Sequence, residues 1–372
     1  MPVSRRSFLQ SAAVGATAAA VLDFRFPALL EARTTRKGFI ILNANENAYG
    51  PSPRVLQAMR DALPFCNRYP DAQRDDFLSS VAQLHHVSYK QLIMGHGSTE
   101  ILRMCVDAFA GPGKRVITAA PTFEVISWCA KARGAEVVTV PLTSNYSHDL
   151  GAMLDKVDAN TTLVYICNPN NPTASITPRT DIETFIGKLP AHTYVLIDEA
   201  YHEFAAASPG YRSFIEDPVR IDHVIVSRTM SKIYGLAGLR LGYSFSAPQT
   251  IQLLQPFQLD QNANMVALMC SVVALDDQGS VASAVVRNGN DRSEFIHQAQ
   301  ARNIRYIPSH TNFVMVDAGR PAPPLIEAFK KRNILIGRPF PPMNNFVRIS
   351  LGLPDDMKSF WSVWDDVVKA SA

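Results

Sequence analysis

The sequence predicts an α/β protein with a large, doubly wound, mostly parallel sheet and a smaller α+β domain. Between about residues 90 and 245, strand-like runs alternate with helical patterns. The strand-like runs are continuous in Val, Ile and Leu, which indicates strands that are buried on both faces. After about residue 250, long helical stretches precede a second set of strands. The larger domain is therefore expected to come first in the chain.

The predicted large domain has alternating elements in chain order. Its strand-like runs are QLIMG (91–95), RVITA (115–119), EVVTVPL (136–142), TLVYICN (162–168), TYVLIDE (193–199) and HVIVS (223–227). Its helical stretches are ILRMCVDAFA (101–110), FEVISWCAKARG (123–134) and PRTDIETFIGKL (178–189). Gly134 is expected to end the second helix, because glycine is favoured just beyond a helix C-terminus.

The predicted small domain begins with helices and continues with strands. Its helical patterns are 251–257, 264–275, 280–303 and 324–333, and its strands lie within 305–317, 334–339 and 345–352. The predicted division of the chain is a leader at 1–30, an N-terminal arm at 31–50, the large domain at 51–260 and the small domain at 261–372.

Charge and composition argue against two classes of partner. The 372 residues carry a formal net charge of only +3, with no basic block after the first few residues. Nucleic acid is therefore not expected as a partner. No apolar stretch reaches about 18 residues, so no membrane span is expected. The five cysteines form no CxxC pair, so we expect no metal site and predict mostly buried free thiols.

The N-terminus has the layout of an export signal. Arg5 and Arg6 in SRRSFLQ (4–10) precede SAAVGATAAAVL (11–22), a small, apolar and uncharged stretch. Paired arginines followed by Phe8 and Leu9 resemble a bacterial twin-arginine signal, which implies the twin-arginine export machinery as a partner and a periplasmic location. The alternative is a disordered or helical tail on a cytoplasmic protein.

Three segments combine strand ends with polar residues. HGSTE (96–100) lies between a strand and a helix, so Gly97, Ser98 and Thr99 could form an anion site or only a helix cap. NPNNPT (168–173) imposes an irregular turn after a strand, where ligands collect in open α/β sheets. Asp198 ends a hydrophobic strand and needs a partner there, or it caps a helix.

A lysine and an arginine follow the last strand of this series. Lys232 lies in SRTMSKIYGLAGLRLGY (227–243), where burying its ammonium group would be costly. A desolvated lysine can form a Schiff base with an aldehyde cofactor, whereas an exposed lysine could simply cover the sheet with its stem. Arg240 is a permanent cation that suits phosphate recognition.

Taken in order, these segments resemble fold-type I pyridoxal-phosphate enzymes, and most closely the class I/II aminotransferases of the histidinol-phosphate aminotransferase type. The resemblance covers roughly residues 40–353. It rests on LNANENAYGPSP (42–53), NRYP (67–70), GHGSTE (95–100), PTF (121–123), NPNNPT (168–173), DEAYHEF (198–204), SRTMSKIYGLAGLRLGY (227–243), SHTNFVMV (309–316), IGRP (336–339) and VRISLG (347–352). It implies a transaminase whose cofactor is pyridoxal 5'-phosphate.

The resemblance implies a role for each residue around the cofactor. Lys232 would form the Schiff base and then move the substrate's α-proton, and Asp198 would pair with the pyridine nitrogen. Asn171 and Tyr201 would bond the ring's phenolic oxygen, and Phe123 would stack on the ring. The expected phosphate ligands are Gly97, Ser98, Thr99, Thr229, Ser231 and Arg240.

The same resemblance implies substrate and subunit contacts. Arg348 would meet the acid group of the amino donor, and Arg338 falls near an arginine that holds the phosphate of histidinol phosphate. Asn45 and Tyr49 would border the substrate pocket. Tyr69 would reach the cofactor phosphate of a second subunit, which implies a homodimer. The small-molecule partners would be an amino donor and a 2-oxo acid acceptor.

Three features depart from the family pattern. Ala174 stands where the family usually has glycine, which predicts an ordinary backbone conformation there. The stretch between Arg338 and Arg348 is a couple of residues short, which weakens the phosphate role of Arg338. The export signal is the third, because histidinol phosphate is a cytoplasmic intermediate. The donor is therefore expected to be some other amine or amino acid.

Two other functions compete with transamination. A decarboxylase or an oxygen-using oxidase of the same fold would present the same lysine, aspartate and phosphate ligands. A non-enzymatic regulator that only binds the cofactor would need a DNA-binding domain upstream, and the leader leaves no room for one. The intact pair of Lys232 and Asp198 also disfavours a silent binder.

Overall fold

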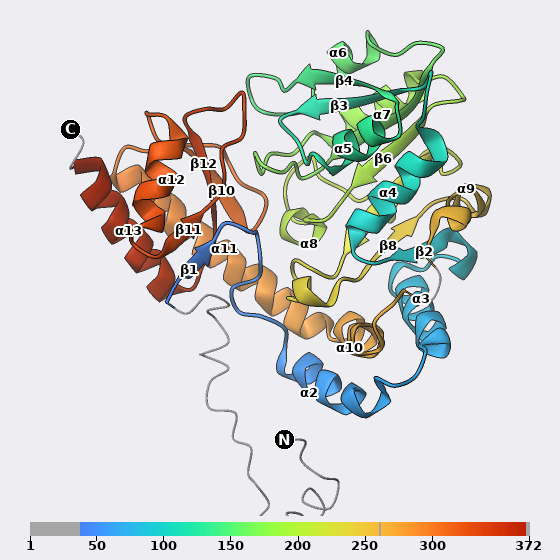
Figure 1. Ribbon diagram of the computed structural model, residues 1–372, viewed down its shortest axis with the longest axis horizontal. Helices are drawn as coiled ribbons and strands as arrows, with labels where there is room; N and C mark the ends of the chain where they lie inside the picture. The colour runs from blue at the N-terminus through green and yellow to red at the C-terminus, as the bar shows by residue number, and fades with distance from the viewer. Residues whose placement is uncertain (1–37, 260–261, 370–372) are drawn as a thin grey trace, which may run out of the picture. The chain divides into compact units, whose positions relative to one another are not determined.

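A seven-stranded mixed sheet forms the centre of the chain in the computed structural model, which describes residues 38–259 and 262–369 (Figure 1). The strand order is β2-β8-β7-β6-β5-β3-β4, and only β8 runs against the other strands. The strands are β2 (Leu92–Gly95), β3 (Arg115–Ala120), β4 (Glu136–Pro141), β5 (Thr161–Cys167), β6 (Tyr194–Asp198), β7 (Val224–Thr229) and β8 (Gly242–Phe245). The prediction of a mostly parallel sheet is confirmed.

Helices cover both faces of this sheet, as the doubly wound prediction requires. The helices that pack in one core are α2 (Pro53–Ala62), α3 (Asp71–His85), α6 (Leu150–Leu154), α7 (Arg179–Lys188), α8 (His202–Ala205) and α10 (Met265–Asp276). Those that pack in the other are α4 (Ser98–Phe109), α5 (Val125–Ala132) and α9 (Pro248–Leu254). Short 3₁₀ turns are η2 (Leu63–Phe65), η3 (Tyr89–Gln91), η4 (Ala237–Leu239) and η5 (Gln255–Phe257).

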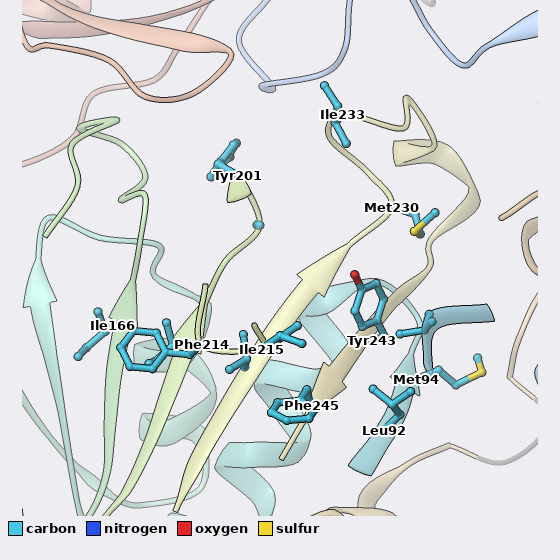
Figure 2. Close-up of a cluster of buried hydrophobic side chains, with 14 of the residues drawn as sticks. Leu92, Met94, Ile166, Tyr201, Phe214, Ile215, Met230, Ile233, Tyr243 and Phe245 are labelled. Atoms are coloured by element: carbon cyan, nitrogen blue, oxygen red, sulfur yellow. The ribbon is translucent and has the colours of Figure 1, made fainter. Parts of the chain in front are cut away.

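Alternate residues of the central strands enter the two cores. In β5, Val164 and Ile166 face the first core, whereas Leu163 and Tyr165 face the second. This two-sided burial explains the continuous aliphatic runs in the sequence. Figure 2 shows part of the first core, which extends to Tyr201 beyond the end of β6 and to Ile233 beyond the end of β7. The core therefore reaches the edge of the sheet where the predicted site residues lie.

A second group of elements has a core of its own. One sheet has the order β12-β10-β9, and a two-stranded sheet pairs β1 with β11. The strands are β1 (Ile40–Leu42), β9 (Arg305–Tyr306), β10 (Phe313–Asp317), β11 (Ile334–Ile336) and β12 (Phe346–Ser350). The helices are α11 (Gln278–Ala301), α12 (Ala322–Lys330) and α13 (Pro354–Lys369). Helix α11 packs against the first core near Val281 and contributes Phe295 to the core of the small sheets.

Some predicted features lie outside the described residues or stay predictions. The predicted leader, with Arg5 and Arg6, falls outside them. The predicted domain boundaries stay predictions, although α10 packs in the core of the large sheet and β1 pairs with β11. Within the described ranges, no single helix is long and apolar enough to cross a membrane, and α10 with α11 meets that test only as a pair bent by 80°.

The cysteines lie mostly inside the protein. All five are free thiols; Cys105, Cys167 and Cys270 are buried, Cys129 is half-buried and Cys66 is exposed. Among the described residues, no three His, Cys, Asp or Glu side chains are grouped in a way that could hold a metal ion.

Candidate active site

The predicted site residues gather at one edge of the large sheet. Strands β2, β3, β5, β6 and β7 run in the same direction, so their carboxyl ends meet at that edge. Asp198 is the last residue of β6, and the segments that follow the other strands carry Gly97, Phe123, Asn171 and Lys232. The topology therefore brings together residues that are up to 135 positions apart in the sequence (232 − 97).

The Lys232 amine lies in a buried environment with charges of both signs nearby. Its Nζ donates a hydrogen bond to the backbone oxygen of Asn45 at 3.2 Å and lies 5.5 Å from the centre of the Tyr201 ring. Burial, followed by the charge of Arg348, lowers the pKa of Lys232 to about 8. A large fraction of this amine is therefore neutral near pH 8, which a nucleophile and proton carrier requires.

Asp198 is a buried carboxylate with two hydrogen-bond donors. It is 2% exposed, and it accepts from the Tyr165 hydroxyl at 2.9 Å and from the Ala200 N–H at 3.2 Å. Burial raises its pKa to about 6, and the bond from Tyr165 opposes that rise. Asp198 is therefore largely ionised above pH 6 and can face a positively charged ring nitrogen. Sequence reasoning missed Tyr165, whose signal was a single hydroxyl in an otherwise aliphatic run.

The groups predicted for the ring oxygen have protein partners. The Asn171 side-chain oxygen accepts from Arg348 Nη1 at 2.5 Å, and the Tyr201 hydroxyl accepts from the Asn45 amide at 2.9 Å. Tyr201 also packs edge-on against Phe313, with ring centroids 5.2 Å apart. Both side chains are thus held in fixed orientations at the site, and their roles toward a ring oxygen stay predictions.

The start of α4 has the features of an anion-binding cradle. Gly97 is the N-cap with φ 73°, and no side chain caps the helix. The alternative reading of HGSTE as a Ser or Thr cap is therefore wrong; the Glu100 carboxylate instead accepts from the His96 N–H at 2.5 Å. The backbone N–H groups of Ser98 and Thr99 are left at the positive end of a helix.

Arg240 and two hydroxyls complete this cradle. A Cβ added at Gly97 would lie 2.3 Å from Arg240 Nη2, so a larger residue there would displace the guanidinium from its present position. Arg240 Nη1 donates to the Ser231 hydroxyl at 3.3 Å, and the Thr229 hydroxyl bonds that of Ser231 at 2.9 Å. A helix N-terminus, a guanidinium and hydroxyls in one place suit a phosphate group.

Arg348 is a buried cation with unused bonding capacity. It extends from β12, where Nη1 bonds Asn171 and Nη2 donates to the Asn43 backbone oxygen at 2.8 Å. Its Nε has no hydrogen-bond partner among the described residues. Burial lowers the pKa of Arg348 to about 10, but the group stays charged at neutral pH. A buried guanidinium with a spare N–H donor can bind the acid group of a small molecule.

Arg338 lies further out and is already paired. Its Nη2 donates to the carboxylate of Glu124, and its Nη1 donates to the Pro339 backbone oxygen at 3.0 Å. Glu124 directly follows Phe123, the residue predicted to stack on the cofactor ring. Phe123 itself packs against the second core. Sequence reasoning did not single out Glu124, because its partner lies 214 positions away.

The N-terminal arm closes over the lysine. Asn45 is 2% exposed; its backbone N–H donates to Ser350 Oγ at 2.8 Å, and its backbone oxygen accepts from Lys232 and from Asn312. Tyr49 bonds Asp291 of α11 at 3.3 Å. The arm also passes so close to the lysine loop that a Cβ at Gly235 would lie 2.5 Å from the backbone carbon of Gly50.

The backbone conformation of Ala174, where the family usually has glycine, is the opposite of the one predicted. Ala174 has φ 61°, in the left-handed region, so the prediction of an ordinary backbone there is wrong. The turn is held from both sides: the Ala174 N–H donates to the Asn170 oxygen, and the Ala174 oxygen accepts from the His310 N–H. The surrounding bonds therefore impose a conformation that glycine would adopt at lower cost.

A buried ion pair lies beneath the site. Arg228 Nε donates to Glu199 at 2.9 Å and its Nη2 donates to Ser213 at 2.8 Å, and a second carboxylate, Glu203, lies 3.8 Å away. Arg228 and Glu199 are 2% and 1% exposed. Because Glu199 follows Asp198 and Arg228 precedes Thr229, the pair ties together the ends of β6 and β7.

Tyr69 lies in the segment between η2 and α3, next to Pro70, which lines a hollow together with Gly95, His96 and Glu100. Its side chain is 73% exposed. Its predicted role across a subunit interface stays a prediction.

Comparison with known proteins gives the family. The model of "Aminotransferase class I and II" matches residues 37–359. The histidinol-phosphate aminotransferase of Symbiobacterium thermophilum is 34% identical over 327 residues, which cover 86% of this chain and 88% of that protein. The histidinol-phosphate aminotransferase 2 of Methylococcus capsulatus is 33% identical over 346 residues, which cover 91% of this chain and 93% of that protein.

Solved structures agree. The histidinol-phosphate aminotransferase of Sinorhizobium meliloti, in complex with pyridoxal-5'-phosphate, is 28% identical, with a TM-score of 0.85 and coverage of 97% of this chain and 100% of that one. Here, Lys232, Asp198 and the cradle at Gly97 supply an amine, an anion and phosphate donors at one sheet edge, which fit this cofactor. The chain therefore belongs to the class I and II aminotransferases, and it is a transaminase whose cofactor is pyridoxal 5'-phosphate.

Proposed function

We propose that this transaminase moves an amino group between an amino acid or amine and a 2-oxo acid, with Arg348 holding the acid group of the substrate. The observation that carries this proposal is the buried Arg348 guanidinium, whose Nε has no hydrogen-bond partner among the described residues. Its charge contributes to the lowered pKa of Lys232, so the two groups share one electrostatic environment. A substrate acid group on Arg348 would therefore lie near the reactive amine.

The residues divide the work in this proposal. Bound pyridoxal phosphate supplies an electron sink for the substrate's α-carbon. Lys232 Nζ would take the proton from that carbon and return it to the cofactor's aldehyde carbon, which its lowered pKa favours at neutral to mildly basic pH. Asp198 would face the ring nitrogen in its ionised form, and Tyr165 orients its carboxylate. The residues that would hold the phosphate are Ser98, Thr99, Ser231, Thr229 and Arg240.

Histidinol phosphate is the first donor to test, because the relatives with more than 30% identity are named for it. The arginine motif at Arg5 and Arg6 supports a second part of the proposal, export by the twin-arginine route, with a donor met in the periplasm. A reporter fused to residues 1–30 would test the export. Localisation that is unchanged after Arg5 and Arg6 are both replaced by Lys would contradict it.

We further propose a homodimer in which Tyr69 of one subunit reaches the cofactor phosphate of the other. Tyr69, Leu63 and Phe65 are 73%, 60% and 50% exposed and lie in one short segment of the chain. Exposed large apolar side chains close together in sequence are typical of an interface. This surface is therefore the expected contact between two copies.

Absorbance of the bound cofactor tests the proposed reaction directly. Each candidate amine, including histidinol phosphate and the common amino acids, is added to the purified holoenzyme, and the cofactor band is followed. A productive donor shifts the band, and 2-oxoglutarate or another 2-oxo acid restores it. If no amine shifts the band, the proposal of transamination with these donors is wrong.

A further inference from the structure

Charged and aromatic side chains form a row outward from Arg348. The guanidinium carbons of Arg348 and Arg338 lie 4.9 and 4.4 Å from the centre of the same ring, Phe340. Beyond Arg338, its Nη2 donates to the Glu124 carboxylate. The row therefore runs from an inner cation through a shared ring to an outer cation and an anion.

The two arginines act on each other, although only the inner one is available. The charge of Arg338 contributes to the lowered pKa of Arg348. Arg348 is 8% exposed with a spare Nε donor, whereas Arg338 has one terminal nitrogen bonded to Glu124 and the other to a backbone oxygen. A ligand that needs both cations must therefore displace Glu124 or share Arg338 with it.

The charges in this row add to a single positive charge. Arg348 and Arg338 contribute two positive charges, and Glu124 contributes one negative charge. A carboxylate carries one negative charge, which matches this sum and needs only Arg348. A phosphate monoester carries about −1.5 to −2 at pH 7 and has three strong acceptor oxygens, so it gains from a second free cation. Glu124 occupies that second cation and so withholds it from a dianion.

We infer that Glu124 makes this transaminase select donors whose acid group is a carboxylate over donors in which it is a phosphate ester. This inference rests on the proposed function, because it assumes that Arg348 receives the acid group of the donor. Selectivity is the difference between the binding free energies of two donors, and Glu124 disfavours the phosphate ester by keeping Arg338 paired.

A matched pair of donors isolates the acid group. L-Histidine and L-histidinol phosphate share the imidazole side chain and the amine, and they differ in the acid-bearing group. In the holoenzyme, single half-reactions followed at the cofactor band give kcat/KM for each donor. We expect Glu124→Gln to raise the ratio of kcat/KM for histidinol phosphate over histidine by about tenfold, through a lower KM for the phosphate ester. Glu327→Gln, at an exposed pair with Lys330, should leave the ratio unchanged.

A second variant tests whether Glu124 acts through Arg338. In an Arg338→Gln background, adding Glu124→Gln should change the ratio less than twofold, because no outer cation remains to be freed. Glu124 is partly exposed and its side chain does not cap α5, so thermal unfolding of Glu124→Gln should match that of the unmodified protein.

Two outcomes would overturn the inference. One is an unchanged ratio in Glu124→Gln, whether neither donor gains or both gain equally, and the other is a tenfold gain in the ratio that persists without Arg338. If instead neither donor shifts the cofactor band in any variant but other amines do, the assignment of Arg348 to histidine-like donors fails. If no amine at all shifts the band, transamination itself fails.

Discussion

Lys232 and Asp198 have pKa values that move toward each other. Burial lowers the first to about 8 and raises the second to about 6. When the pH lies between these two pKa values, the protein without its cofactor holds a protonated amine and an ionised carboxylate in one buried site. Such a pair is costly for folding but suits a cofactor that brings an aldehyde and a ring nitrogen.

We expect the reactivity of Lys232 to follow its lowered pKa. The neutral amine attacks an aldehyde, and its fraction rises with pH through about 8 instead of about 10.5. Capture of pyridoxal phosphate by the cofactor-free protein should therefore reach half its maximal rate near pH 8, as measured by absorbance after mixing. Lys232→Ala should abolish this band and lower kcat by about 10²-fold to 10⁴-fold. Lys330→Ala is the surface control, and a midpoint near pH 10.5 would contradict the prediction.

Replacing Asp198 should separate stability from activity. Its pKa rises from 3.8 to about 6 on folding, so its contribution to stability is present below pH 3.8 and is lost as the pH rises through about 6. At pH 8, Asp198→Asn should therefore raise the free energy of unfolding of the cofactor-free protein by about 2–3 kcal/mol, with little change at pH 3.5. Chemical denaturation at the two pH values measures this. The holoenzyme variant should lose most of its kcat; a variant that is no more stable at pH 8 would refute the argument.

The sequence was most informative where one residue defines the chemistry. Lys232, Asp198 and Arg240 follow from the order of short motifs after predicted strands. The bond from Tyr165 to Asp198 and the bonds of Asn45 to Tyr201 and Ser350 could not be predicted, because they join segments that are distant in sequence. Ala174 was predicted wrongly because its conformation is imposed by bonds to Asn170 and His310, and not by its own preference.

At the scale of the elements, Ala174 in the turn after β5 tests how strongly neighbouring segments determine the backbone conformation of one residue. Ala174→Gly removes about 1–2 kcal/mol of left-handed strain, but it also removes a fully buried methyl group worth about 0.8 kcal/mol and adds about 0.4–1 kcal/mol of unfolded-state entropy. The free energy of unfolding should therefore change by less than about 1 kcal/mol. Ala174→Val, which overfills the core and keeps the strain, should destabilise by at least about 2 kcal/mol. Denaturant unfolding compares the two, and equal effects would contradict this account.

The ion pair that joins β6 and β7 should be sensitive to the loss of one partner. Arg228→Met leaves the buried carboxylates of Glu199 and Glu203 without their cation, so we expect a loss of about 3–5 kcal/mol in the free energy of unfolding. The double variant with Glu199→Gln should recover part of this loss. Lys358→Met, at an exposed pair with Asp355, should change stability by less than about 1 kcal/mol. An Arg228 variant as mild as that control would show that the pair contributes little.

Whether a strand or helix could be predicted from the sequence depended on its length and on how deeply it is buried. The strands β3, β5, β6 and β7 were predicted because their aliphatic runs are continuous. Strand β8, with the sequence GYSF, and β1, with only three residues, were missed because their pairing partners determine them. Helices α2, α3 and α13 were also left without a prediction.

At the scale of the whole molecule, the proposed homodimer predicts that each active site needs residues from both subunits. If Tyr69 acts across the interface, a mixture of Lys232→Ala and Tyr69→Ala subunits contains hybrids with one complete site and one doubly impaired site. Mixed subunits should therefore regain cofactor affinity and activity in up to half of the hybrid's sites. Light scattering gives the mass, and the two variants measured separately are the controls. A monomer, or no gain on mixing, would contradict the arrangement.

The close approach of Gly235 to Gly50 limits how this enzyme can be diversified. The two glycines leave no room for a side chain between the arm and the lysine loop. A library that randomises the loop from Lys232 to Arg240 should retain glycine at position 235 in every functional clone, whatever substrate is selected. New specificity would have to come from side chains on either flank of that contact, so the arm and the loop are expected to evolve as one unit.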